Sequence, residues 1–167
     1  MSIPSRLENY LDAQGARYEI VAHRRSRSSA ETAHLAGVSP HQIAKSVLLE
    51  DDEGPMLAVL PADRFVMLGE LGHQLGRKAL HLADQDRIAA LFADCAAGAV
   101  PPFGMAWGVP TIVDDELDAN AVLYLESGDH ERLLCMSNAQ FRQVMHGAWH
   151  GHFGKTALHS PSVFVPR

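Results

Sequence analysis

The stretch KSVLLEDDEGPMLAVL, residues 45–60, decides the expected fold. Two apolar runs, 47–49 and 56–60, flank a short acidic loop that contains Gly54, and this pattern predicts a β-hairpin. Because several further strand-like segments follow one another through short turns, a mixed, largely antiparallel sheet is favoured over a doubly wound parallel one. These further segments are residues 18–21, 79–82, 109–113, 121–125 and 132–136.

Helices are expected between these strands. Residues 5–14 carry one apolar face and stop at Gly15, and the capping-box pattern Ser28-x-x-Glu31 opens a helix that closes at Gly37. Other helices are expected at residues 69–75, at 84–92 and after Ser137. The sequence therefore predicts one α+β domain over residues 1–146, followed by a His-rich, flexible C-terminal tail over 147–167.

Composition limits the classes of function. The chain has 167 residues with 20 acidic side chains against 14 Lys and Arg, a net charge of -6, which excludes a protein that coats nucleic acid through a broad basic surface. A net charge of -6 is still compatible with a small group of basic residues that contacts nucleic acid locally. No apolar segment is long enough to span a membrane, and residues 1–11 lack the apolar core of a signal peptide. We therefore expect a soluble cytoplasmic protein that acts on neither membranes nor DNA.

Two segments are candidates for the chemistry. Lys45 stands at the start of an apolar strand, where a partly desolvated ammonium can clamp a substrate, although spacing alone favours a surface lysine more. In the loop Gly98-Ala99-Val100-Pro101-Pro102-Phe103-Gly104, prolines stiffen the backbone and glycines let N–H groups approach an oxygen atom. An ordinary connector explains these glycines equally well.

The remaining candidates are weaker. His130 ends a turn, 127–130, that displays an imidazole beside a carboxylate, but a solvent-facing histidine is the commoner outcome. Cys95 has no positive neighbour to activate it and is expected to be a buried structural thiol. His146 and His150 have the i, i+4 spacing of metal ligands, but no third ligand lies nearby in the sequence. No metal or cofactor is therefore expected.

Four motifs, taken together, resemble the YbaK/prolyl-tRNA-synthetase-associated domain family in order and spacing. They are residues 45–49 (KSVLL), residues 58–63 (AVLPAD), Gly98-x-x-x-Pro102-Phe103-Gly104 and residues 109–114 (VPTIVD), and the resemblance extends over about residues 5–145. It implies an α+β domain with a mixed, barrel-like sheet flanked by helices. It also implies a free-standing, trans-editing aminoacyl-tRNA deacylase, which hydrolyses the ester between a mischarged amino acid and the 3′-terminal adenosine of tRNA.

The resemblance also assigns residues. The strand-start lysine of the family matches Lys45, and the loop that holds the aminoacyl end matches Gly98 and Pro102, so the loop 98–104 is expected to bind substrate. Ser46, Pro101 and His130 occupy positions that vary among relatives and shape the amino-acid pocket, so the amino acid that is cleared stays open. Expected partners are mischarged tRNA and an aminoacyl-tRNA synthetase. The alternative is a non-catalytic module of the same fold that binds aminoacyl-tRNA or a synthetase.

The basic run before the first capping box has two interpretations. Arg24, Arg25 and Arg27, together with Arg77 and Lys78, are candidates for contacts with the phosphates of the tRNA acceptor stem. The same arginines also fit a solvated loop, and the sequence does not favour either interpretation.

Overall fold

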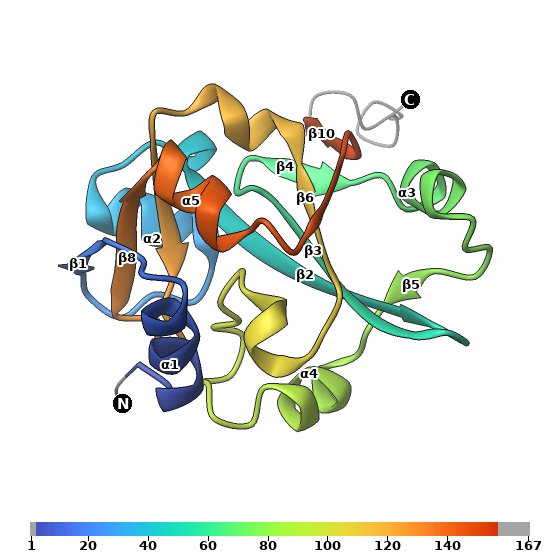
Figure 1. Ribbon diagram of the computed structural model, residues 1–167, viewed down its shortest axis with the longest axis horizontal. Helices are drawn as coiled ribbons and strands as arrows, with labels where there is room; N and C mark the ends of the chain where they lie inside the picture. Colours follow the sequence, from blue (N-terminus) through green and yellow to red (C-terminus); the bar gives the residue numbers. More distant parts are fainter. Residues whose placement is uncertain (1–2, 157–167) are drawn as a thin grey trace, which may run out of the picture.

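The computed structural model of the protein describes residues 3–156, which form a mixed sheet with helices around it (Figure 1). The sheet has eight strands in the order β1-β8-β7-β2-β3-β6-β9, with β5 also paired to β2. Its members are β1 (Glu19–Ala22), β2 (Ile43–Asp51), β3 (Gly54–Pro61), β5 (His81–Leu82), β6 (Thr111–Asp114), β7 (Val122–Glu126), β8 (Arg132–Ser137) and β9 (Trp149–Gly151). Strands β4 (Arg64–Val66) and β10 (Gly154–Thr156) pair in a separate ribbon.

The predicted hairpin is confirmed as β2 and β3, and it runs through the middle of the molecule (Figure 1). Its register extends from Ala44 opposite Pro61 to Asp51 opposite Gly54. Successive side chains of a strand point to opposite faces, so β2 divides its apolar residues between two clusters. Leu48 packs in the larger cluster and Leu49 in the smaller one. The hairpin therefore has a core on both faces, which explains its nearly continuous apolar sequence.

The sheet is mixed, as predicted. The pairs β1–β8, β7–β8, β2–β3 and β2–β5 are antiparallel, whereas β2–β7, β3–β6 and β6–β9 are parallel. The parallel pair between β2 and β7 is short and covers only two residues of each strand. This short pairing leaves part of the β2 edge open.

The expected helices are present, and the predicted caps hold them. They are α1 (Ser5–Ala13), α2 (Ser29–Ala36), α3 (Leu68–Leu75), α4 (Gln85–Leu91) and α5 (Asn138–Val144). The Ser28 hydroxyl accepts from the Glu31 amide at 3.1 Å, and Gly37 ends α2 with a positive φ of 70°. Asp84 and Ser137 cap α4 and α5 in the same way. Within residues 3–156, none of the helices has the length and apolar character needed to cross a membrane.

The prediction of a flexible tail from residue 147 is wrong for the segment that the structure describes. Strand β9 pairs with β6 and β10 pairs with β4, and between them Phe153 is fully buried. The buried carboxylate of Asp114 holds this segment by accepting from the amides of Phe153, at 2.9 Å, and Gly154, at 2.6 Å. The physical reason is that β9 pairs with the edge of β6 and Phe153 buries its ring in the smaller apolar cluster. The rest of the predicted tail, 157–167, lies outside the described residues.

Candidate functional site

The candidate site lies at a gap along the edge of β2. Toward β7, β2 pairs only through Ile43 and Ala44, and toward β5 only through Leu49 and Glu50. Within the described residues, no strand pairs with the β2 edge between these points. A pocket of about 50 Å³ opens there, between the start of α2 and the β7–β8 turn. Its lining residues are Ser28, Ser29, Thr32, Ile43, Ala44, Lys45, Ser46, Gly98, Val100, Glu126, His130 and Leu133.

Lys45 is half-buried at this pocket instead of extending freely into solvent. Its Nζ lies 5.0 Å from the centroid of the Phe65 ring, a cation–π distance. Burial lowers the pKa of Lys45, and the nearby charge of Asp63 raises it in part. The structure therefore supports the desolvated lysine over the surface lysine that spacing alone favoured.

Ser46 supplies a polar group that has no protein partner. Its Oγ is buried, and no hydrogen-bond partner for it lies among residues 3–156. Leaving a buried hydroxyl unpaired costs about 1–3 kcal/mol, a cost that a ligand with a polar group can relieve. Ser46 is one of the residues that line the pocket, and a hydroxyl can donate to or accept from a ligand that reaches it.

His130 is buried, so its expected solvent-facing position is wrong. Only 8% of its surface is exposed, and its φ is 62°, a left-handed conformation that histidine rarely adopts. Its Nε2 lies 2.5 Å from the carbonyl oxygen of Ala97. Since a carbonyl only accepts, Nε2 donates the hydrogen of this bond. The imidazole is thus fixed in orientation as one wall of the pocket.

The turn around His130 is held by two acidic side chains that sequence reasoning did not assign. Oε1 of Glu126 accepts from the amides of Ser127, Gly128 and His130, each at 3.1 Å. The buried Asp129 accepts from the amides of the two residues that follow His130, both at 2.9 Å. Asp129 therefore stabilises the turn and is not the carboxylate partner of the imidazole that the sequence indicated. The only sequence signal for this arrangement was the pair of acidic residues Glu126 and Asp129 with the small residues Ser127 and Gly128 between them.

The loop 98–104 contributes fewer residues to the pocket than the resemblance implied. Gly98 and Val100 line it, and a Cβ on Gly98 would lie 3.6 Å from Nε2 of His130. Behind them, Ala99 and Phe103 are fully buried in the core. Gly104 is needed for packing, because a Cβ there would collide with Thr111 Oγ1. Pro101 and Pro102 are also buried and do not line the pocket.

The arginines Arg24, Arg25 and Arg27 lie exposed on the segment that leads into α2, whose first turn lines the pocket. This segment is attached to the turn of His130, since the Ser26 amide donates to the His130 carbonyl at 3.2 Å. One guanidinium nitrogen of Arg25 is 3.7 Å from a carboxylate oxygen of Glu131. The structure therefore brings the basic run next to the pocket.

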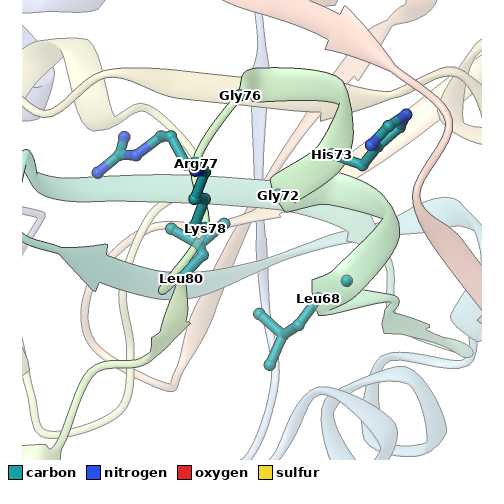
Figure 2. A pocket seen from close by; sticks show the side chains of 8 residues that line it. Leu68, Gly72, His73, Gly76, Arg77, Lys78 and Leu80 are labelled. Carbon is teal, nitrogen blue, oxygen red and sulfur yellow. The ribbon is translucent and has the colours of Figure 1, made fainter.

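A second, larger hollow of about 420 Å³ lies along α3 (Figure 2). In it, the side chains of His73 and Arg77 point in opposite directions. The Arg77 guanidinium pairs with Asp51 and donates to the Gly54 carbonyl at 2.7 Å, so it is not available to a phosphate as the sequence suggested. Of the predicted contact residues, only Lys78 remains here, and we do not assign the chemistry to this hollow.

The structure favours neither Cys95 as a reactive thiol nor His146 and His150 as metal ligands. Burial, with the charges of Asp94 and Glu126, raises the pKa of Cys95 to about 12, so its thiolate is scarce at neutral pH. His150 lies in β9, beyond the end of α5, so its spacing from His146 does not place the two rings on one helical face. Among residues 3–156, no group of three or more His, Cys, Asp or Glu side chains is placed to hold a metal ion.

Comparison with known proteins gives a family and a fold. The family model described as an aminoacyl-tRNA editing domain matches residues 23–144, which include every residue that lines the pocket. A candidate trans-editing enzyme for prolyl-tRNA synthetase is 22% identical, covers 90% of this chain and 96% of its own, and has a TM-score of 0.78. A hypothetical protein is 23% identical, with 90% and 99% covered and a TM-score of 0.78.

One further solved structure places the same fold inside a longer chain. A signal transduction protein of Marinobacter aquaeolei is 24% identical, and the match covers 95% of this chain but 32% of that one, with a TM-score of 0.74. At these identities the solved structures show the fold alone. None of the curated proteins matches the sequence.

Proposed function

The chain belongs to the aminoacyl-tRNA editing domain family, and we propose that it is a trans-editing deacylase that hydrolyses mischarged aminoacyl-tRNA. One observation carries this proposal: Lys45, Ser46 with its unpartnered hydroxyl and His130 with its fixed imidazole all line one small pocket at the edge of β2. Together they offer a cation, a hydroxyl and an imidazole ring. An ester carbonyl with its developing negative charge needs such groups around it.

The reaction requires no covalent nucleophile from the protein. The oxygen of water attacks the ester carbonyl carbon, the bond between that carbon and the terminal ribose oxygen breaks, and the ribose oxygen takes up a proton. In the proposal, the Lys45 ammonium contacts the substrate carbonyl or the terminal ribose, and the amides of Gly98 and Val100, which line the pocket, orient the ester. Each donor aimed at the developing oxyanion lowers the barrier by about 3 kcal/mol.

The size and lining of the pocket also limit which amino acid can be cleared from the tRNA. Its volume of about 50 Å³ is well below the roughly 300–1,000 Å³ of pockets that take drug-sized ligands, which favours a small side chain. The apolar groups around it, Ile43, Val100 and Leu133, favour an uncharged side chain. We therefore propose a small amino acid as the one that is cleared.

The basic segment completes the proposed substrate complex. Arg24, Arg25 and Arg27 contact phosphates of the acceptor stem in this proposal, while the aminoacyl end enters the pocket beside α2. The support for it is their exposure and their place directly before Ser28 and Ser29, which line the pocket. With a net charge of -6, we expect weak and salt-sensitive tRNA binding.

Deacylation assays test the proposal. The purified protein is incubated with tRNAs charged with Ala, Cys, Ser, Thr or Pro, and the loss of ester is followed for the wild type, Lys45→Ala and Arg142→Ala. Arg142 is the control, because it is an exposed cationic residue of α5 that lies outside the pocket and outside the candidate tRNA contacts. We expect Lys45→Ala to lower the rate about 100-fold and the control to leave it unchanged. If no charged tRNA is hydrolysed, the non-catalytic alternative is correct, and equal rates for Lys45→Ala and wild type refute the role of Lys45.

A further inference from the structure

An exposed aromatic ring lies next to the pocket lysine. Phe65, in the middle of β4, is 52% exposed, and the Nζ of Lys45 lies 5.0 Å from its ring centroid. The residue opposite Phe65 in β10 is Lys155. Side chains of directly opposite residues leave the same face of an antiparallel pair, so the ring has a lysine on that side as well. We name Lys45, Phe65 and Lys155 the Phe65 platform.

The exposure of Phe65 does not come from a loose chain. Its neighbour Val66 points the other way and packs against the smaller core cluster. The ribbon is fixed on that side, because the Met67 amide donates to the Phe153 carbonyl at 2.7 Å and Asp114 holds the start of β10. A rigid strand therefore presents the phenyl ring outward, where burial would have been more favourable for an isolated apolar group.

The charges around the platform favour an anionic ligand. Asp63, whose charge acts on Lys45, lies 3.0 Å from Arg64 and is also near His41, and Glu116 lies 3.7 Å from both of these residues. Among residues 3–156, no carboxylate lies within 4.0 Å of the ammonium of Lys45 or Lys155. An acidic protein thus places two lysines, neither of which forms an ion pair within the described residues 3–156, beside an exposed aromatic ring.

We propose that the Phe65 platform binds the unpaired 3′ end of the RNA substrate. The terminal base stacks on the exposed face of Phe65, and Lys155 contacts a phosphate on the 5′ side of that base. The group esterified to the terminal ribose then enters the pocket past Lys45. Aromatic stacking together with cations along the backbone is how proteins hold single-stranded nucleic acid without reading its sequence. This inference rests on the proposed function only for the identity of the RNA.

Binding of an uncharged RNA tests the platform without requiring hydrolysis. A 5′-labelled RNA oligonucleotide that ends in CCA is titrated with the full-length protein, and fluorescence anisotropy gives the Kd. We expect Phe65→Ala to weaken binding about 10-fold and Phe65→Trp to preserve it. Lys155→Ala weakens binding and reduces its salt dependence. Trp149→Ala is the matched control, since Trp149 is an aromatic residue that is 55% exposed on β9, and we expect no change.

Two further measurements separate stacking from the effect of Phe65 on Lys45. An oligonucleotide with an abasic 3′-terminal nucleotide should bind the wild type as weakly as the intact one binds Phe65→Ala. In the Lys45→Ala background, Phe65→Ala should still weaken binding of the intact RNA about 10-fold. If the abasic RNA binds the wild type as well as the intact RNA, or if the effect disappears in that background, the platform is refuted.

The outcomes for the two proposals are distinguishable. RNA binding that depends on Phe65, without deacylation, refutes the proposed function and retains the platform. Deacylation with RNA binding unchanged in Phe65→Ala refutes the platform and retains the function. Because Phe65 is exposed, we expect the Phe65→Ala protein to fold with an unchanged Tm, which thermal unfolding checks.

Discussion

Replacement of Asp114 tests whether one buried carboxylate keeps the C-terminal segment in place. Asp114 is fully buried, and its Oδ1 accepts from the Glu116 amide at 2.8 Å. Its Oδ2 accepts from the amides of Phe153 and Gly154 at 2.9 and 2.6 Å. In Asp114→Asn, one carboxylate oxygen becomes an NH₂ group, which donates and cannot accept, so one side of this arrangement must lose its acceptor.

The expected cost follows from that count. Hydrogen bonds to a charged group contribute about 1.5–3 kcal/mol each, and the asparagine retains one neutral acceptor. If its oxygen faces β10, the bond to Glu116 is lost and the other two weaken. We therefore expect Asp114→Asn to lower the free energy of unfolding by about 2–4 kcal/mol. For a chain of this size that corresponds to a decrease in Tm of about 5–15 °C.

Denaturant unfolding measures the total change, and amide hydrogen exchange shows where it occurs. We expect the amides of residues 149–156 to lose protection first, because their contacts with the body of the protein pass through Asp114 and Phe153. Asp115→Asn is the control, since Asp115 is an exposed neighbour. If residues 149–156 keep wild-type protection in Asp114→Asn, the carboxylate does not hold the segment and the reasoning is wrong.

Two other predictions concern charge. Replacing Arg24, Arg25 and Arg27 together by Ala should lower the slope of log K against log salt for tRNA binding by about 2, because each phosphate contact contributes about 0.7–0.9; an unchanged slope would show that the segment is only a solvated loop. The hydrogen bond from Arg77 is the main cause that lowers the pKa of Asp51 to about 2, below the ordinary aspartate value of 3.8. The stability that this pair contributes is therefore complete above about pH 4 and is lost as the pH falls toward 2, and acid unfolding of Arg77→Ala should lack this component.

Local sequence signals predicted most of the fold because the elements depend on nearby residues. The hairpin followed from two apolar runs around Gly54, and the starts of helices followed from the side chains of Ser28, Asp84 and Ser137. The C-terminal strands could not be predicted in this way. Their sequence is short and rich in His and Gly, and what orders it is the distant carboxylate of Asp114, for which the sequence carries no spacing signal.

The site shows the same division between local and tertiary information. The resemblance selected Lys45 and Gly98, the turn of residues 127–130 indicated His130, and the structure places all three at one pocket. The sequence did not show that His130 would be buried with its ring fixed by Ala97, or that most of the loop 98–104 belongs to the core. These facts depend on how the β7–β8 turn packs against the loop, which no local pattern encodes.

The pocket itself arises from a mismatch in strand pairing. Had β7 continued along β2 beyond Ala44, its backbone would have filled the space where Lys45 and Ser46 now line the pocket. Instead β7 ends in a turn that Glu126 and Asp129 stabilise, and the Arg25 segment packs on that turn. On the opposite side of Lys45, the ribbon of β4 and β10 presents Phe65. An overall acidic chain therefore carries cationic groups on both sides of one lysine, so that in our proposals the RNA end is held by local charge and the aminoacyl group by the gap in the sheet.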